Sequence, residues 1–125
     1  MEKVKTILAI LVLLVAGCQI FNREFNAICD NWRSDEKGCK SLRQEIVRQD
    51  FGKLKHNLIS KPEESVIKCL GPPNERFREG KIELYSYFVE PGVQCMEEVE
   101  DVIDVYRIAL EIQDGIVVGI REIVP

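Results

Sequence analysis

Apolar residues are distributed along the chain in three successive patterns. Residues 6–15 form an almost unbroken apolar run, TILAILVLLV, with one hydroxyl and no charge. Between residues 41 and 70 apolar positions recur at intervals of three and four, which is typical of amphipathic helices. From residue 81 onward they alternate with polar positions or form short β-branched runs, which is typical of strands. The chain is therefore expected to place helices before strands, behind an apolar N-terminal segment.

The first helix is expected to run from Ser41 to about His56. Its apolar stripe consists of Leu42, Ile46, Val47, Phe51 and Leu54. Ser41 precedes Gln44 by three residues, which matches a capping box with Ser41 as the N-cap. Gly52 lowers the helix propensity and is expected to mark a break near that position.

A second, shorter helix is expected between Ser60 and Gly71. Ser60 is a favourable N-cap residue, and Pro62 fits the first turn because the N–H that proline lacks has no partner there. Gly71 suits the left-handed conformation that ends many helices, and Pro72 and Pro73 prevent the helix from resuming.

Three strands are expected over residues 81–90, 102–112 and 116–124. In the first of them Tyr85 and Tyr87 share one face, because successive side chains of a strand point to opposite faces. Only the helices are long enough to cover an apolar sheet face. The elements therefore predict an α+β fold with two N-terminal helices packed on a three-stranded antiparallel meander.

The last hairpin can be paired in two registers. A two-residue loop of Asp114 and Gly115 would place Leu110 opposite Gly119, whereas a loop one residue longer would place Leu110 opposite Val118. Only the longer loop keeps the apolar residues together, because a slip of one residue moves every side chain to the other face. We therefore expect the three-residue loop, with Gly115 in the left-handed conformation.

The N-terminal segment has the features of a secretory signal. Lys3 and Lys5 precede the apolar run, which is too short for a membrane span of roughly 20 residues. The sequence LVAGC at residues 14–18 resembles the lipobox of bacterial lipoproteins, in which the chain is cut before the cysteine and its sulfur carries diacylglycerol. The resemblance implies a signal peptide over residues 1–17 and a palmitate-bearing lipid anchor on Cys18. The alternative is an ordinary signal peptide with an incidental cysteine.

The chain beyond the signal divides into two parts by composition. Residues 18–40 lack a clear helical stripe and are rich in loop-forming residues, so they are expected to form a lipidated tether and a disulfide loop. Residues 41–125 carry the expected helices and strands, and they are expected to form the folded domain.

Four cysteines remain beyond the anchor, namely Cys29, Cys39, Cys69 and Cys95. An even number in a small exported domain predicts two disulfides, for which three pairings are possible. We favour Cys29 with Cys39, which closes a short local loop, and Cys69 with Cys95. A zinc site is the alternative, but the cysteines are scattered and His56 is the only histidine.

The charge of the chain narrows the classes of partner. The full chain carries −4, and removal of residues 1–17, with two lysines and one glutamate, leaves −5. Phosphate contacts need clustered Lys and Arg, so nucleic acid is not an expected partner, and membrane attachment is expected from the acyl chains alone. No catalytic triad and no calcium-loop spacing are found, so we expect no catalytic residue, metal, cofactor or small-molecule substrate.

Short motifs in residues 55–123 resemble the SmpA/OmlA (BamE-like) family of small outer-membrane lipoproteins. They are the helix end Leu70-Gly71-Pro72-Pro73, the strand motif Tyr85-Ser86-Tyr87 and the hairpin turn Gln113-Asp114-Gly115. The resemblance implies an α-α-β-β-β fold without catalysis or a cofactor, on the periplasmic side of the outer membrane rather than at the inner membrane. The chain lacks two family features: a glycine before the short helix, and a partner-binding Gln-Gly-Asn-type segment after the anchor.

The expected function is that of a non-enzymatic, lipid-anchored cell-envelope lipoprotein that binds other envelope proteins as a scaffold in outer-membrane assembly or integrity. The β-barrel assembly machinery is the partner that the resemblance suggests. The candidate contact residues, on the solvent side of the sheet and in the first loop, are Trp32, Tyr85, Tyr87 and Arg107. For Trp32 the favoured alternative is packing on the core or a disulfide, and the two tyrosines are equally well explained as strand-forming residues. The alternative functions are a tethered inhibitor of an envelope enzyme and a structural spacer without a specific partner.

Overall fold

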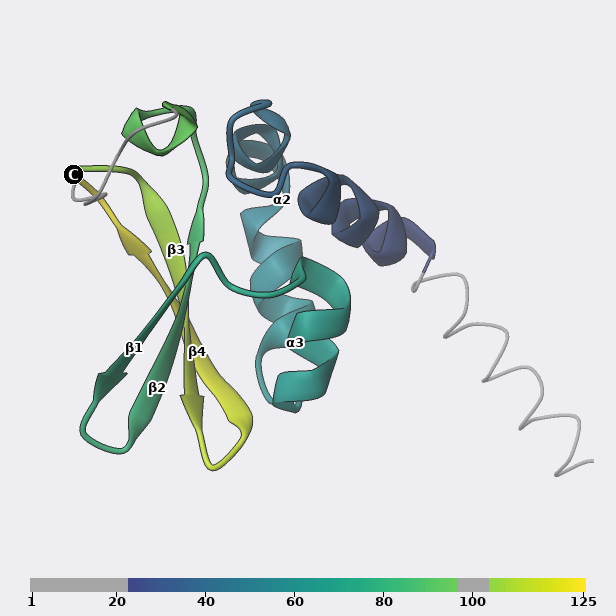
Figure 1. Cartoon of the computed structure of the whole chain (residues 1–125). Helices are drawn as coiled ribbons and strands as arrows, with labels where there is room; N and C mark the ends of the chain where they lie inside the picture. Colours follow the sequence, from purple (N-terminus) through teal and green to yellow (C-terminus); the bar gives the residue numbers. More distant parts are fainter. Residues whose placement is uncertain (1–22, 97–103) are drawn as a thin grey trace, which may run out of the picture.

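The computed structural model describes residues 23–96 and 104–125, and in it three helices lie on one side of a four-stranded antiparallel sheet (Figure 1). The first helix spans residues 23–34. It is followed by α2 (Leu42–Leu58), α3 (Glu63–Leu70), β1 (Glu75–Glu79), β2 (Ile82–Phe88), the short 3-10 helix η1 (Val93–Cys95), β3 (Arg107–Gln113) and β4 (Ile116–Ile123). The strand order is β1-β2-β3-β4. The α+β class is confirmed, whereas the expected arrangement of two helices and three strands is wrong.

The additional strand, β1, has a sequence without apolar alternation, which is why the pattern did not reveal it. Four of its five residues are charged, and most of the strand is exposed. It pairs with β2 through a two-residue turn in which Gly80 has φ 61°, with Glu79 opposite Ile82 and Phe77 opposite Leu84. A charged edge strand of this kind discourages pairing with other chains, and it has little apolar surface to bury.

The additional helix lies in the segment that the sequence assigned to a tether and a loop. Ile28, Cys29 and Trp32 are buried in the core, and Phe25 packs against it. These residues are spaced at i, i+3, i+4 and i+7, which is the stripe of an amphipathic helix. Part of the segment that was expected to be a tether and a loop, residues 23–34, is therefore helical and packs on the core. The expected signal peptide, residues 1–17, and the expected lipid anchor, Cys18, lie outside the described residues.

The N-terminus of α2 is capped by a residue other than the one expected. Ser41 has φ 66° and makes no side-chain capping hydrogen bond. The carboxylate of Asp35 accepts instead from the backbone N–H of Leu42 at 3.0 Å and of Arg43 at 3.1 Å. The expected break is found at Asp50, whose φ of −126° and ψ of 18° interrupt the helix.

The short helix α3 ends where the sequence predicted, but it lacks the expected cap. Gly71 ends it with φ 76°, and its N–H donates to the carbonyl of Ile67. Ser60 also has a positive φ, of 71°, and its backbone N–H donates to the carbonyl of Val117 on β4. The segment before α3 is therefore tied to the edge of the sheet, with Pro62 forming an isolated bridge to Ile116.

The core lies between the helices and the inner face of the sheet. The sheet contributes the side chains of Tyr85, Tyr87, Val89, Ile108, Leu110, Ile112, Val117 and Ile120. The helices contribute Ile28, Cys29, Trp32, Ile46, Leu54, Leu58, Val66, Cys69 and Leu70. Removal of this apolar surface from water is the main stabilising contribution to the fold. The expected alternation of side chains in β2 and β3 is confirmed.

The last hairpin keeps its apolar face by a route that neither expected register included. Its loop consists of Asp114 and Gly115, with φ of 52° and 76°, so the three-residue loop is wrong while the left-handed Gly115 is confirmed. A β-bulge then inserts Val118 as an extra residue, and beyond it Leu110 pairs with Ile120. The bulge thus restores the alignment of apolar residues that a plain two-residue loop would have lost.

Candidate functional site

The described cysteines form two disulfides that join distant parts of the chain. Cys29 on the first helix bonds to Cys69 on α3, and Cys39 bonds to Cys95 in η1. The prediction of two disulfides is confirmed, but the favoured pairing is wrong. Because residues 23–34 are helical, Cys29 faces the core beside α3 and cannot close a local loop with Cys39.

A buried arginine lies at the junction between the helices and the sheet. The side chain of Arg43, on α2, is only 2% exposed. Its Nε donates to the Trp32 carbonyl at 3.1 Å, and its Nη1 donates to Asn74 Oδ1 at 2.8 Å and to the Phe88 carbonyl at 3.2 Å. The guanidinium also lies over the rings of Trp32, at 5.0 Å, and Tyr87, at 5.8 Å. Burial lowers the pKa of Arg43 to about 10, so the side chain remains charged at neutral pH.

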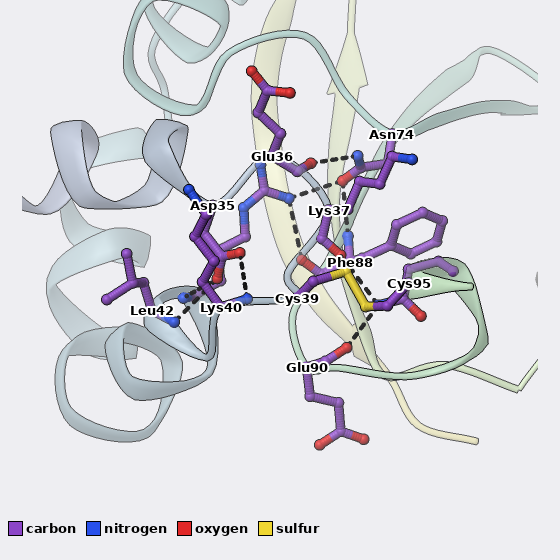
Figure 2. The surroundings of a disulfide bond; sticks show 12 residues. Asp35, Glu36, Lys37, Cys39, Lys40, Leu42, Asn74, Phe88, Glu90 and Cys95 are labelled. Atoms are coloured by element: carbon purple, nitrogen blue, oxygen red, sulfur yellow. Dashed lines mark hydrogen bonds between the residues drawn. A yellow bond between two sulfur atoms is a disulfide. The ribbon is translucent and has the colours of Figure 1, made fainter. Parts of the chain in front are cut away.

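Asp35 and Asn74 complete the connections around Arg43, and Figure 2 shows both of them. Besides capping α2, the Asp35 carboxylate accepts from the backbone N–H of Lys40 at 2.8 Å. The Asn74 amide donates to the Glu36 carbonyl at 2.7 Å, and its oxygen accepts from the Phe88 N–H at 3.0 Å. One network of hydrogen bonds thus joins the loop after the first helix, the start of α2 and the end of β2.

The loop of residues 36–40 packs tightly against Phe88 at the end of β2 (Figure 2), and the side chain of Gln94 bonds to it. Gly38 has φ 71°, and a Cβ at this position would lie 2.8 Å from the Phe88 carbonyl oxygen, so only glycine fits. The buried amide of Gln94 donates to the carbonyls of Lys37 at 3.1 Å and Glu90 at 2.7 Å. The disulfide between Cys39 and Cys95 joins the same two loops.

Three of the four candidate contact residues have no exposed surface. Trp32, Tyr85 and Tyr87 are each 0% exposed. The interpretation that they form a solvent-facing contact surface is therefore wrong, because the helices cover the face of the sheet that carries the tyrosines. Core packing, the alternative for Trp32, is confirmed, since its ring meets that of Tyr87 edge to face at 6.1 Å.

The polar groups of the two tyrosines are used inside the protein. The Tyr87 hydroxyl donates to the Gly71 carbonyl at 2.9 Å, and burial raises the pKa of Tyr87 well above its usual value. The Tyr85 hydroxyl bonds to the carboxylate of Glu63, and the guanidinium of Arg76 lies 4.7 Å from the centre of the Tyr85 ring. Each hydroxyl thus fixes one end of α3 to the sheet.

The fourth candidate, Arg107, lies on the outer face of the sheet but is only 8% exposed. Its Nε lies 2.8 Å from a carboxylate oxygen of Glu75, and its guanidinium lies over the Phe88 ring at 5.7 Å. Because Arg107 is on β3 and Glu75 is on β1, the ion pair crosses β2. The expectation of an exposed arginine is wrong, since this side chain covers the sheet instead of facing solvent.

Grooves lie along the first helix. One of them, of about 710 Å³, lies beside the Cys29–Cys69 disulfide, and its polar lining includes Arg33, Lys61 and Lys68. The Arg33 guanidinium donates to the Cys69 carbonyl at 3.1 Å, which satisfies the end of α3. A smaller groove, of about 510 Å³, lies beside His56. Among the described residues no group of His, Cys, Asp and Glu side chains is placed to hold a metal ion.

Comparison of the chain with protein-family models, with curated proteins and with solved structures finds no match. In addition, none of the helices in residues 23–96 and 104–125 has the length and apolar character needed to cross a membrane.

Proposed function

We propose that this chain is a lipid-anchored, non-enzymatic module of the bacterial cell envelope that binds other envelope proteins. The main support for this proposal is that the two disulfides lie in the domain that follows the lipobox-like sequence. They cross-link the domain that follows Cys18, and structural disulfides are typical of exported proteins. The lipobox and the disulfides independently favour the same compartment, the periplasmic side of a bacterial membrane, for which the sequence favours the outer membrane.

The anchor and the domain are separated by a very short stretch of chain. Helical structure is already present at residue 23, five residues after Cys18. Five extended residues span at most about 18 Å, so the domain is held close to the membrane surface. This arrangement favours a module that acts at the membrane over one that extends far into the periplasm.

The described titratable groups support a binding role more than a catalytic one. The strongest pKa shifts belong to Arg43 and Tyr87, which are buried in the core and bonded to backbone carbonyls. Shifted groups of this kind are structural, whereas catalytic groups are placed where a substrate can reach them.

Exposed apolar side chains near the turn of the last hairpin replace the buried aromatics as the proposed contact surface. Ile116 and Val118 are 40% and 50% exposed, and Ile59 is 36% exposed. The Ser60 N–H donates to the Val117 carbonyl and the Val117 N–H donates to the Lys61 carbonyl, so the segment that follows Ile59 runs beside β4, the strand that carries Ile116 and Val118. We propose that this patch contacts an envelope protein, for which an apolar surface with a polar rim is suited.

The anchor is tested by labelling cells with a palmitate analogue and separating membrane from soluble fractions. We expect label and membrane association for the natural chain, and loss of both in Cys18→Ala. Recovery of an unlabelled, uncleaved chain from the cytosol would disprove the envelope assignment.

The contact surface is tested with a photo-crosslinking amino acid at Val118. The matched control carries it at Arg78, an exposed position on the opposite edge strand, β1. We expect a discrete adduct with an outer-membrane assembly component from Val118 only. Equal adducts from both positions, or adducts only with abundant lipoproteins, would favour the spacer.

A further inference from the structure

The two disulfides lie in opposite environments. Cys29 and Cys69 are 3% and 6% exposed and belong to the core. Cys95, in contrast, is exposed, and its partner Cys39 is half-buried. Thiol–disulfide exchange needs access of a thiolate to one sulfur along the line of the S–S bond, so the second disulfide, which has the more exposed cysteines, is expected to react more readily than the one in the core.

Two exposed apolar side chains lie next to Cys95. Val93 is 39% exposed and Met96 is 67% exposed, and both lie within two residues of this cysteine. An apolar rim around a reactive sulfur suits docking of a protein that carries its own thiol in a shallow apolar groove. The rim is fully assembled in the oxidised protein, since η1 holds Val93 and Cys95 in one turn.

Cys39 differs from Cys95 in the charged residues beside it. Lys37 and Lys40 lie two positions before and one position after Cys39 in the chain, and both are exposed. Ammonium groups near a cysteine favour its thiolate, and a better stabilised thiolate is the better leaving group in exchange. Cys95 is therefore the more exposed cysteine of the pair, and Cys39 is the one that we expect to leave.

The surrounding structure holds the two loops together without the disulfide. The Gln94 amide bridges the carbonyls of Lys37 and Glu90, and Gly38 packs on the end of β2. After opening, these contacts keep the two thiols near each other. Re-formation of the bond is then an intramolecular reaction at high effective concentration.

We propose that Cys39–Cys95 is a thiol–disulfide exchange site that accepts a thiolate at Cys95. In the first step the attacking thiolate forms a mixed disulfide with Cys95, and Cys39 leaves as a thiolate. If the attacker is a dithiol, its second thiolate then displaces Cys95 and closes its own disulfide. The dithiol is oxidised by two electrons while the Cys39–Cys95 pair is reduced, and Cys29–Cys69 stays closed. The site does not depend on the lipid anchor or on the proposed partner.

The first experiment treats the purified natural chain with graded dithiothreitol, quenches it in acid, alkylates free thiols and maps them by mass spectrometry. We expect Cys39 and Cys95 to become free at least about tenfold faster than Cys29 and Cys69. The near-UV circular dichroism of Trp32 is expected to persist while Cys39 and Cys95 are released, because the core stays folded. Equal rates for the two disulfides, or earlier opening of Cys29–Cys69, would overturn the proposal.

The second experiment determines which sulfur is attacked. With glutathione as the probe, we expect the mixed disulfide on Cys95, and a Lys37→Gln/Lys40→Gln variant is expected to open several-fold more slowly. Lys68→Gln is the matched control, because it removes a lysine beside Cys69 and leaves opening of Cys39–Cys95 unchanged. A mixed disulfide on Cys39, or an unchanged rate in the double variant, would contradict this direction of attack.

The third experiment distinguishes a small thiol from a protein partner. A thioredoxin-fold dithiol protein without its resolving cysteine is offered to the natural chain and to a Val93→Ser/Met96→Ser variant. We expect a trapped complex through Cys95 with the natural chain, several-fold less of it with the variant, and an equal reaction of both with glutathione. If the variant reacts less with glutathione as well as with the dithiol protein, Val93 and Met96 do not act as a docking surface. If no complex is trapped with the natural chain, the proposal of a protein partner is wrong and the site reacts only with small thiols.

The contribution of the glutamine bridge is measured by re-oxidation. In Gln94→Ala we expect the Cys39–Cys95 bond to re-form several-fold more slowly after removal of the reductant. An unchanged rate would show that the loops are held by other contacts, which contradicts the role assigned to Gln94.

Discussion

In the two central strands, β2 and β3, both faces of the sheet are largely buried, but different kinds of group lie on them. On the inner face Tyr87 and Leu110 are 0% exposed beneath the helices. On the outer face Ser86 and Ala109 are also 0% exposed, although the helices of the described chain lie on the other side (Figure 1). There the ion pair between Arg107 and Glu75 joins β3 to β1 and passes over β2.

This difference allows the contributions of packing and of charge to stability to be compared within one sheet. The inner face depends on apolar area and close fit, which salt does not screen. The outer face depends on ion pairs, which are effective where they are shielded from water and weak where they are exposed. Substitutions on the two faces should therefore differ in size and in their response to pH and salt.

The largest effect is expected on the inner face, in Tyr87→Ala. The substitution removes a fully buried ring that contacts Trp32, and it leaves the Gly71 carbonyl without its donor. We expect the free energy of unfolding in urea to fall by about 3–5 kcal/mol. Tyr87→Phe, which keeps the ring and loses only the hydroxyl, should cost about 1 kcal/mol. Similar losses in the two variants would contradict the dominance of packing.

A smaller effect is expected on the outer face, in Arg107→Met. The variant keeps an apolar stem over Phe88 but leaves the Glu75 carboxylate, a quarter of whose side chain is exposed, without its partner. We expect a loss of about 2 kcal/mol in the free energy of unfolding. Adding Glu75→Gln should recover part of it, because the unpaired charge is removed. If the double variant loses as much free energy of unfolding as the two single variants together, Arg107 and Glu75 do not stabilise each other.

The pH dependence should also differ between the faces. Burial raises the pKa of Tyr87 in the folded protein, so the folded state holds this proton where the unfolded state loses it. Its contribution to stability is complete below the unfolded value of about 10 and falls as the pH rises above it. Arg43, whose folded pKa is lowered, contributes in the opposite sense over the same range.

We expect Tyr87→Phe to lose less stability than the natural chain between about pH 9 and about pH 11, measured by thermal melting. Arg107→Met, which alters the outer face, serves as the control and should follow the natural pH profile. If Tyr87→Phe loses stability more steeply than the natural chain as the pH rises, folding does not raise the pKa of Tyr87.

The smallest effect is expected for Arg121→Gln. Arg121 bonds to Glu79 at 2.8 Å, but both side chains are well exposed, at 40% and 63%. We expect a loss below about 1 kcal/mol, and the loss should disappear at about 1 M salt. A loss as large as that of Arg107→Met would mean that exposure does not govern the strength of these pairs.

The parts of the fold that could be predicted are those with local apolar patterns. Alternation in β2 and β3, the end of α3 at Gly71 and the α+β class all follow from neighbouring residues. The stripe formed by Phe25, Cys29 and Trp32 was also present, but the polar composition around it favoured a loop. The edge strand β1 offered no such pattern, because it buries almost nothing.

The parts that could not be predicted depend on residues far apart in the chain. Asp35 replaces Ser41 as the helix cap because a chain reversal brings its carboxylate back to the N-terminus of α2. The burial of Tyr85 depends on helices whose placement no strand pattern specifies. Disulfide pairing likewise depends on the three-dimensional path, so the sequence supported two bonds but not their partners.

The two disulfides also enclose overlapping stretches of the chain, residues 29–69 and 39–95. A protease that cuts the backbone once anywhere between Cys29 and Cys95 therefore leaves both halves in one covalent molecule. The hairpin of β3 and β4 lies outside these loops and is retained after a cut only by its contacts with β2 and the helices. A single backbone cut therefore has different consequences on the two sides of Cys95. Between Cys29 and Cys95 the fragments stay covalently joined, whereas after Cys95 the final hairpin can be lost.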